Sequence, residues 1–506
     1  MATPIEMEES NNTEKEDVLC RTCSSDNVAI KKDLGIVTMV AVGFNICNSW
    51  AGLLASTQVA LVQGGPATLV FGLIFSSILY VCIALSMAEL ASVYPTAGGQ
   101  YHFSSVLSPS GCNRVISYVC GFLTVFSWVA IGSAVAMIFS QQVLALAQFY
   151  NPSLILHPWQ YFVIYQAFGV FVLLYNILGL KRLPRTHDVG FLVTIGLFLV
   201  SVILFIVRPT EKASNEFVWT TFLNYTGWPD GVCFLSAQLT TCFIYAGLDG
   251  ALHLAEDALN PRLVVPRATL TTISIGFCTA FAYTIAMLYS ISDFEAILSL
   301  EGYFPFEMSR QAYRSDKIAA GLQLGGIFMA FFVFNAVMQT SSRITWSLAR
   351  DNAIFKSRIL AAIHPSLGIP LWSTVASWFM ISLGGCVFLA SSTAFSALLA
   401  SCVILQQLSF AIPCALILYQ RRSEVYLPKN RSFRLAHWLG WFINGYVVVV
   451  TLVLTIFFVL PPYLPTTASN MNYSAAILAV VAGIATVNWY LYARRHYQGP
   501  RIQFQD

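Results

Sequence analysis

Residues 36–54 read IVTMVAVGFNICNSWAGLL, an apolar segment whose middle is interrupted by small and polar residues. One apolar run ends near Val42, and another begins at Trp50. A helix in lipid must keep its backbone amides hydrogen-bonded, so an interruption at membrane depth survives only where it lines a cavity. The stretch from Gly43 to Ser49 therefore predicts a broken membrane helix beside a polar hollow.

The same pattern returns in the second half of the chain. Residues 240–254 read TTCFIYAGLDGALHL, and this apolar run breaks between Tyr245 and Gly250. A matched pair of interrupted helices, one in each half of a chain, is the best sequence pointer to the substrate site of a secondary transporter. We therefore expect the two breaks to face each other across one binding site.

The composition places most of the chain in a lipid bilayer. Its 506 residues are 57% hydrophobic, 14% aromatic and only 10% charged. Soluble domains contain about 25% charged residues. The formal net charge of +3 gives no reason to expect a polyanionic partner, so nucleic-acid binding is excluded.

Apolar runs of roughly 20 residues, the length that spans a bilayer, predict an all-α membrane protein of about 12 transmembrane helices. A tail at 1–30 is polar, acidic and expected to be disordered, and a transport core covers 34–420. An odd number of spans separates the two breaks, so the halves 34–207 and 231–419 form a 5+5 inverted repeat with discontinuous helices 1 and 6. Residues 441–496 form two peripheral transmembrane helices. Ser391 marks the thin boundary between the ninth and tenth spans.

The distribution of basic residues sets the orientation. All but five of the 27 Lys and Arg residues fall on one side, which is therefore predicted to be cytoplasmic along with both termini. The sequons at Asn224 and Asn472 then face outward, where they are candidates for glycosylation in a plasma-membrane protein.

No metal site or cofactor is expected. Cys20 and Cys23 form a lone CxxC pair in the tail, whereas zinc needs four ligands. The seven histidines are scattered, which argues against a membrane-embedded enzyme.

The first break offers a site for a substrate carboxylate. Where the helix restarts, its first amides are unpaired and carry partial positive charge. Neither broken span has a Lys or Arg in its middle. The alternative is a kink filled by packing and water. The candidate substrate-binding residues here are Gly43, Asn45, Asn48, Ser49 and Trp50.

The second break contains Asp249, an acidic residue near mid-membrane. A charge there is costly and indicates function. Asp249 either pairs with a substrate ammonium or carries the coupling proton; it is also a good helix N-cap. His253, one turn on, is either a core histidine or a proton relay. The remaining substrate-binding candidates are Tyr245, Gly247 and Trp128, the aromatic ones by cation–π contact.

Two stretches that carry turn residues, 88–101 after the second predicted span and 256–267 after the sixth, predict inner gates at the cytoplasmic rim. Glu89, Glu256 and Arg343 either pair across the closed state or remain solvated, and solvation is favoured because exposed pairs contribute little.

These segments resemble the amino acid–polyamine–organocation superfamily, and within it the fungal amino acid/choline/GABA permease group. The resemblance rests on Gly43 to Gly52, Tyr94 to Tyr101, Asp249 to Glu256 with Asn260-Pro261, and Ser342-Arg343 through Arg350-Asp351.

The resemblance implies a twelve-helix fold with helices 1 and 6 broken around a central site. It also implies proton-driven uptake of small amines or amino acids. The loop from Asn45 to Trp50 would hold the carboxylate, and Tyr245 to Asp249 would line the amine side. A lysine that serves coupling in helix five of some members is absent from residues 190–207. A sodium site is not supported, although Thr340 and Ser341 could supply hydroxyls.

The expected function is a secondary active permease for small amino acids or amines such as GABA or choline, coupled to H+. It would work by alternating access, and its partners would be the small-molecule substrate and the lipid bilayer. A transporter-like nutrient sensor without transport activity is the alternative.

Overall fold

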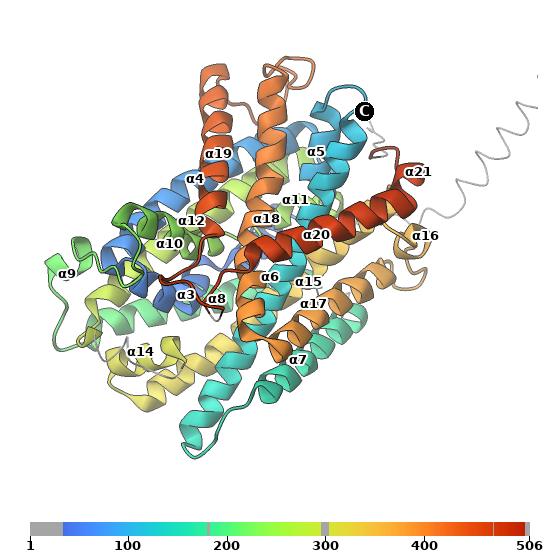
Figure 1. The fold of residues 1–506 in the computed structure, drawn as a ribbon. Coiled ribbons are helices and arrows are strands. Elements are labelled where there is room, and N and C mark those ends of the chain that lie inside the picture. The colour runs from blue at the N-terminus through green and yellow to red at the C-terminus, as the bar shows by residue number, and fades with distance from the viewer. Residues whose placement is uncertain (1–33, 180–182, 295–302, 469, 501–506) are drawn as a thin grey trace, which may run out of the picture.

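The computed structural model describes residues 34–179, 183–294, 303–468 and 470–500, so the predicted tail lies outside the described residues (Figure 1). Within these ranges the chain is almost entirely helical, and pairing of extended backbone is limited to isolated bridges such as Leu34 with Ala258. The helices of the first half are α2 (Ile36–Cys47), α3 (Ser49–Val62), α4 (Gly65–Val93), α5 (Gln100–Leu107), α6 (Asn113–Tyr150), α7 (Pro158–Leu178), α8 (Leu183–Val207) and α9 (Asn215–Trp219).

The second half begins with α10 (Asp230–Phe243), α11 (Gly250–His253) and a 3-10 turn, η2 (Ala255–Asp257). The helices that follow are α12 (Pro261–Tyr289), α14 (Phe304–Tyr313), α15 (Asp316–Arg350), α16 (Ser357–Leu360), α17 (Leu371–Ala390), α18 (Ser392–Tyr419), α19 (His437–Phe458), α20 (Ser474–Asn488), the π-helical turn η3 (Trp489–Ala493) and α21 (Arg494–His496).

Eleven helices of the described part are long and apolar enough to cross a membrane, which confirms the all-α membrane class. The predicted span at 231–257 is not among them, because it is divided into α10 of 14 residues and α11 of 4. The boundary at Ser391 is confirmed. Its backbone is extended, and its side chain accepts a hydrogen bond from the Ala394 amide at the start of α18.

The outer surface of the bundle is apolar. Large hydrophobic side chains stand exposed on α7 and α8, such as Phe171 at 57%, Leu192 at 69% and Ile203 at 57%. Such an exterior suits lipid tails rather than water.

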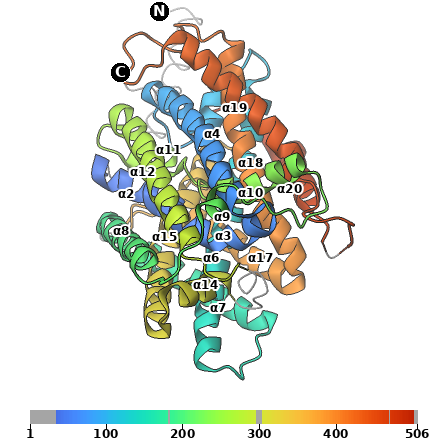
Figure 2. The same ribbon diagram turned by 90° about the vertical axis from the view of Figure 1, so that its left-hand side faces the viewer.

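Helices of the two halves pack side by side. α4 lies along α12, α6 along α15, and α7 along α17, while α2 packs between α12 and α8 (Figure 2). The second, third and fourth spans of the first predicted repeat thus each pack against the corresponding span of the second predicted repeat. The inverted repeat stays a prediction. What matters for the site is that α2, α3, α10 and α11 are enclosed by α6, α12 and α15.

Candidate substrate site between two broken helices

The first break is a single residue. α2 ends at Cys47, Asn48 adopts φ 36° and ψ 52°, and α3 begins at Ser49. Asparagine is one of the few non-glycine residues that tolerate this left-handed conformation. The amides of Ala51 and Gly52 both donate to the Asn48 carbonyl. The amides of Ser49 and Trp50 are therefore the ones at the open start of α3.

The second break is longer and touches the first. α10 ends at Phe243, and turns lead to α11 at Gly250. Gly247 has φ +88°, and a Cβ there would lie 2.3 Å from Cγ2 of Ile46. The Ser49 hydroxyl donates to the Ile244 carbonyl at 2.9 Å. The two interruptions are therefore in contact.

A cavity of about 70 Å³ lies beside this contact. The breaks contribute Ile46, Cys47, Asn48, Phe243 and Ala246, and the rest of its wall includes Ala51, Gly52, Ala55, Ile131, Val135, Ile138, Gln142, Gly326, Met329, Ala330 and Val333.

Two polar atoms in this wall have no hydrogen-bond partner. They are Oδ1 of Asn48 and Oε1 of Gln142, both buried. No charged side chain of the described residues lines the cavity. A buried acceptor without a donor costs about 1–3 kcal/mol. A ligand that brings N–H groups would relieve that cost.

A second cavity of about 580 Å³ adjoins the first and shares Ala55, Ile138 and Phe243 with it. Its wall also contains Gln63 and Asn472, and Asn472 belongs to the side predicted to be external. The two cavities together lead from the breaks toward that side.

The other predicted residues of the first break pack into the surrounding helices. Nδ2 of Asn45 donates to the His187 carbonyl at 2.8 Å. The Trp50 ring packs on Tyr283 at 5.2 Å. At Gly43 a Cβ would lie 2.5 Å from the Thr272 hydroxyl, so this glycine permits close packing of α2 on α12. Among the predicted binding residues, all of them in the described ranges, Asn48 alone lines the smaller cavity.

Tyr245 points away from the cavity toward α4. Its hydroxyl lies 2.6 Å from that of Ser77, and its ring stacks at a tilt on Tyr80 at 5.1 Å. Its position in the break is as predicted, but its ring is used for packing.

Asp249 is buried among four polar side chains. Its Oδ2 accepts from Nε2 of Gln100 at 2.6 Å and Nε1 of Trp128 at 3.3 Å, and it lies 2.9 Å from Nε2 of His253. Its Oδ1 accepts from Nε2 of Gln406 at 2.9 Å. The Asp249 side chain makes no capping bond to α11, so the cap interpretation is not supported here.

Two of these partners, Gln100 and Gln406, were not predicted from the sequence. Gln406 and Gln407 stand together in the apolar run of α18, and such an amide pair at membrane depth was the available signal. Gln100 starts α5 within the Tyr94–Tyr101 motif, but nothing in the sequence around it predicts a contact with Asp249.

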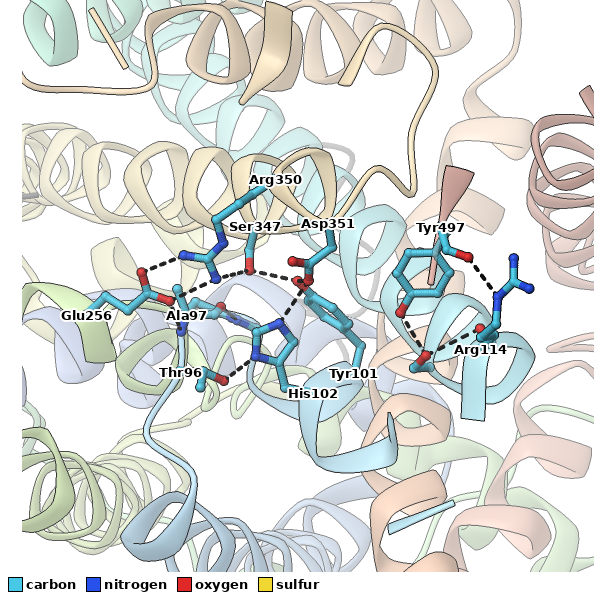
Figure 3. A network of polar contacts seen from close by, with 12 residues as sticks. Thr96, Ala97, Tyr101, His102, Arg114, Glu256, Ser347, Arg350, Asp351 and Tyr497 are labelled. Atoms are coloured by element: carbon cyan, nitrogen blue, oxygen red, sulfur yellow. Dashed lines mark hydrogen bonds and ion pairs between the residues drawn. The ribbon is translucent and has the colours of Figure 1, made fainter. Parts of the chain in front are cut away.

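The residues of the predicted inner gate are held by ion pairs and hydrogen bonds (Figure 3). Glu256 binds Arg350 through contacts of 2.8 and 3.1 Å and accepts from the Ala97 amide at 3.1 Å. Nη2 of Arg343 binds Asp257 at 3.0 Å. These contacts join the two predicted gate stretches to the end of α15.

The preference for solvated rim charges was wrong for two residues. Glu89 is 2% exposed and Arg343 is 7% exposed. Glu89 pairs with Arg422 at 2.7 Å and with Arg431 at 2.8 Å, in the segment between α18 and α19. The gate charges pair with other residues, not with one another.

A second buried group in Figure 3 joins α5 to the end of α15. Asp351 accepts from the Tyr101 hydroxyl at 2.8 Å and lies 3.1 Å from Nε2 of His102, whose Nδ1 is 2.6 Å from the Thr96 hydroxyl. Burial alone would raise the pKa of the Asp351 carboxyl, but the hydrogen bond and charge of His102, with Arg350 and Tyr101, bring that pKa below its ordinary value.

The remaining predicted residues are the hydroxyls considered for a sodium site, the two sequons and the candidates for a metal site. Thr340 donates to the Ala336 carbonyl, whereas the buried Ser341 hydroxyl has no partner. The side-chain amides of Asn224 and Asn472 donate to nearby carbonyls. No cluster of three or more His, Cys, Asp or Glu able to hold a metal occurs in the described part of the chain.

The chain matches the family described as amino acid permease over residues 34–482. A choline transporter of Saccharomyces cerevisiae is 31% identical, with 91% of this chain and 82% of that protein covered. A swainsonine transporter of Arthroderma benhamiae is 27% identical, with 93% of each covered. A 7-keto 8-aminopelargonic acid transporter of S. cerevisiae is 25% identical over 92% of this chain and 94% of that protein. These names denote transporters rather than enzymes. The chain is thus an integral membrane protein that belongs to the amino acid permease family, within the amino acid–polyamine–organocation superfamily.

Proposed function

We propose that this protein is a secondary active permease that takes up a small amine or amino acid together with a proton across the plasma membrane. The observation that carries the proposal is the cavity at the contact of the two broken helices, with the unpartnered acceptors of Asn48 and Gln142 in its wall. Both termini would be cytoplasmic, as the distribution of basic residues predicts.

The wall chemistry favours a substrate with N–H donors. Asn48 and Gln142 offer oxygen atoms to an ammonium group. The Ser49 and Trp50 amides at the start of α3, next to the wall rather than in it, would suit a carboxylate. The apolar remainder of the wall accommodates methyl and methylene groups. An amino acid or GABA carries both an ammonium group and a carboxylate. Choline, the substrate named for one relative, has methyl groups that fit the apolar part of the wall.

Alternating access would proceed from the conformation described here. The inner gate is closed by Glu256–Arg350 and Asp257–Arg343, and the cavities lead toward the predicted outer side. Opening would require these pairs to separate while the outer cavity closes.

The test is uptake of labelled amino acids, GABA and choline into proteoliposomes, with and without an inward proton gradient. Accumulation of at least one of these probes above equilibrium supports the proposal. Binding of a probe without flux would instead identify the sensor alternative, and neither binding nor flux would refute the permease assignment.

A pair of adjacent glutamines provides a matched control. Gln142 lines the smaller cavity, whereas Gln141 lines only the larger one. A hydrogen bond to a charged group contributes about 1.5–3 kcal/mol. Gln142→Ala should therefore raise KM roughly 10- to 100-fold, and Gln141→Ala should change it far less. Equal effects of the two substitutions would argue against a substrate at Gln142.

A further inference from the structure

His253 is fully buried and has a polar partner at each ring nitrogen. Its Nε2 lies 2.9 Å from Oδ2 of Asp249, and its Nδ1 lies 2.9 Å from the carbonyl oxygen of Ala97. Ala97 belongs to the segment between α4 and α5, on the side of the closed gate.

These two contacts fix a proton count. A carbonyl oxygen only accepts, so Nδ1 of His253 must carry a hydrogen. Nε2 then either carries a second hydrogen and donates to an ionised Asp249, or accepts one from a protonated Asp249. In both cases the pair is electrically neutral and holds one proton beyond those of a carboxylate and a neutral imidazole.

The other partners of Asp249 decide where that proton resides. Trp128 Nε1 can only donate. The Gln406 amide is oriented by the Gly247 N–H, which donates to its Oε1 at 3.2 Å, so its NH2 group faces Asp249. Gln100 supplies another donor. A carboxyl group surrounded by donors is stabilised in its ionised form, which makes His253 the imidazolium.

In the described ranges, the charged side chains around this pair have ion-pair partners of their own. The ionisable groups of the neighbouring elements include Cys47 on α2, Tyr101 and His102 on α5, Cys120 on α6, Cys402 on α18, Glu256 and Asp257 of η2, and Arg343 and Arg350 of α15; His102 pairs with Asp351. The two carboxylates of η2 and the two arginines of α15 form two ion pairs. Within the described ranges, no ionisable side chain of α12 makes an ion pair with this group.

We propose that His253 holds the coupled proton, with Asp249 as its ionised counter-ion. This assignment rests on the proposed proton-coupled transport and names the residue responsible. While Ala97 packs on α11, loss of the Nδ1 proton would leave a lone pair against a carbonyl oxygen, so the proton is retained. When the gate opens and Ala97 leaves, the proton on Nδ1 passes to cytoplasmic water. Nε2–H continues to donate to Asp249, which stays anionic until the site is recharged from outside.

The same segment is held by a second contact, which ties proton release to gate opening. The Ala97 amide donates to Glu256, which in turn binds Arg350. The contacts of Glu256 with Ala97 and Arg350 are drawn in Figure 3. Opening of the gate would break the hydrogen bonds of the Ala97 amide and the Ala97 carbonyl together.

The test uses full-length protein in proteoliposomes, with a labelled substrate found by the panel above and a pH-sensitive dye inside. Wild type should acidify the lumen during uptake. His253→Asn should retain substrate exchange at equal pH, but lose luminal acidification and gradient-driven accumulation at least tenfold. The control is His187→Asn, which alters a buried histidine whose Nε2 faces Gln339 rather than a carboxylate; it should keep its proton influx.

The outcomes separate the two proposals. Wild type that moves no probe refutes the transport function itself. Wild type with proton influx that persists in His253→Asn, or that disappears only in His187→Asn, overturns the assignment to His253 while leaving transport intact.

If His253→Asn does not fold, ring-nitrogen spectra of 15N-histidine protein in the His102→Asn background decide. Exposed histidines are neutral at pH 8, since their usual pKa is about 6.5. A remaining imidazolium signal that Asp249→Asn abolishes supports the assignment, and its absence overturns it.

Discussion

Removing the charge of Glu89 should destabilise the protein more than the same change at an exposed glutamate of the segment between α18 and α19. Glu89, near the end of α4, accepts from Nη2 of Arg422, from Nε and Nη2 of Arg431, and from the Leu435 amide, at 2.7, 3.2, 2.8 and 2.9 Å. It thereby fixes the segment between α18 and α19 to the end of α4.

The magnitude follows from burial. The side chains of Glu89 and Arg422 are both 2% exposed, and that of Arg431 is 7% exposed. Removing one partner of a buried ion pair leaves an uncompensated charge and costs about 3–5 kcal/mol. Glu89→Gln keeps the shape but places an amide against two guanidinium groups, so we expect a loss in that range.

The measurement is the free energy of unfolding of purified protein, obtained by titration from mild detergent into SDS. Glu424→Gln is the control, because Glu424 pairs with Lys429 at 3.1 Å in the same segment with side chains 66% and 69% exposed. Exposed pairs contribute at most about 1 kcal/mol. If Glu89→Gln cost no more than the control, the buried triad would not hold this segment and the reasoning would fail.

Three other substitutions test the site and its surroundings. Asn48→Gly should preserve the backbone at φ 36° while removing the side chain, so substrate KM rises but unfolding is unchanged; Asn48→Ala should in addition lose about 1–2 kcal/mol of stability. Gly247→Ala should abolish uptake, because its Cβ would clash with the facing isoleucine, whereas Gly445→Ala on α19, with no atom within 4 Å, should be silent in the same uptake assay. Because the pKa of Asp351 is lowered in the folded state, its ionised form stabilises the fold above pH 3.8, and this stabilisation is lost as the pH falls below that value. Melting curves should therefore show that Asp351→Asn lowers the stability most above pH 3.8 and progressively less below it.

The sequence predicts those features that depend on local pattern. The positions of both breaks follow from polar and glycine residues inside apolar runs, and Ser391 follows from a short polar turn between two such runs. Gly247 could be singled out because the break needs a residue that tolerates φ +88°. In each case the relevant neighbours are close in sequence.

Pairings across the bundle could not be predicted in this way. Glu89 and Arg422 are separated by 333 positions, and nothing local distinguishes a buried rim charge from a solvated one. The same holds for Asp249 and Gln406, 157 positions apart. The direction of the Tyr245 ring could not be predicted either. An aromatic ring inside a break can face either the cavity or a neighbouring helix, and here the Tyr245 hydroxyl lies 2.6 Å from that of Ser77 on α4.

The spacing of Asp249 and His253 is the point at which sequence and mechanism meet. An i,i+4 separation puts both side chains on one face of a helix, yet α11 extends only from Gly250 to His253. One helical turn is enough to align the two side chains. Because α11 ends at His253, this residue lies directly beside the backbone of Ala97. In the proposed mechanism, the break in the second half therefore places a proton-binding pair in contact with the segment that moves when the gate opens.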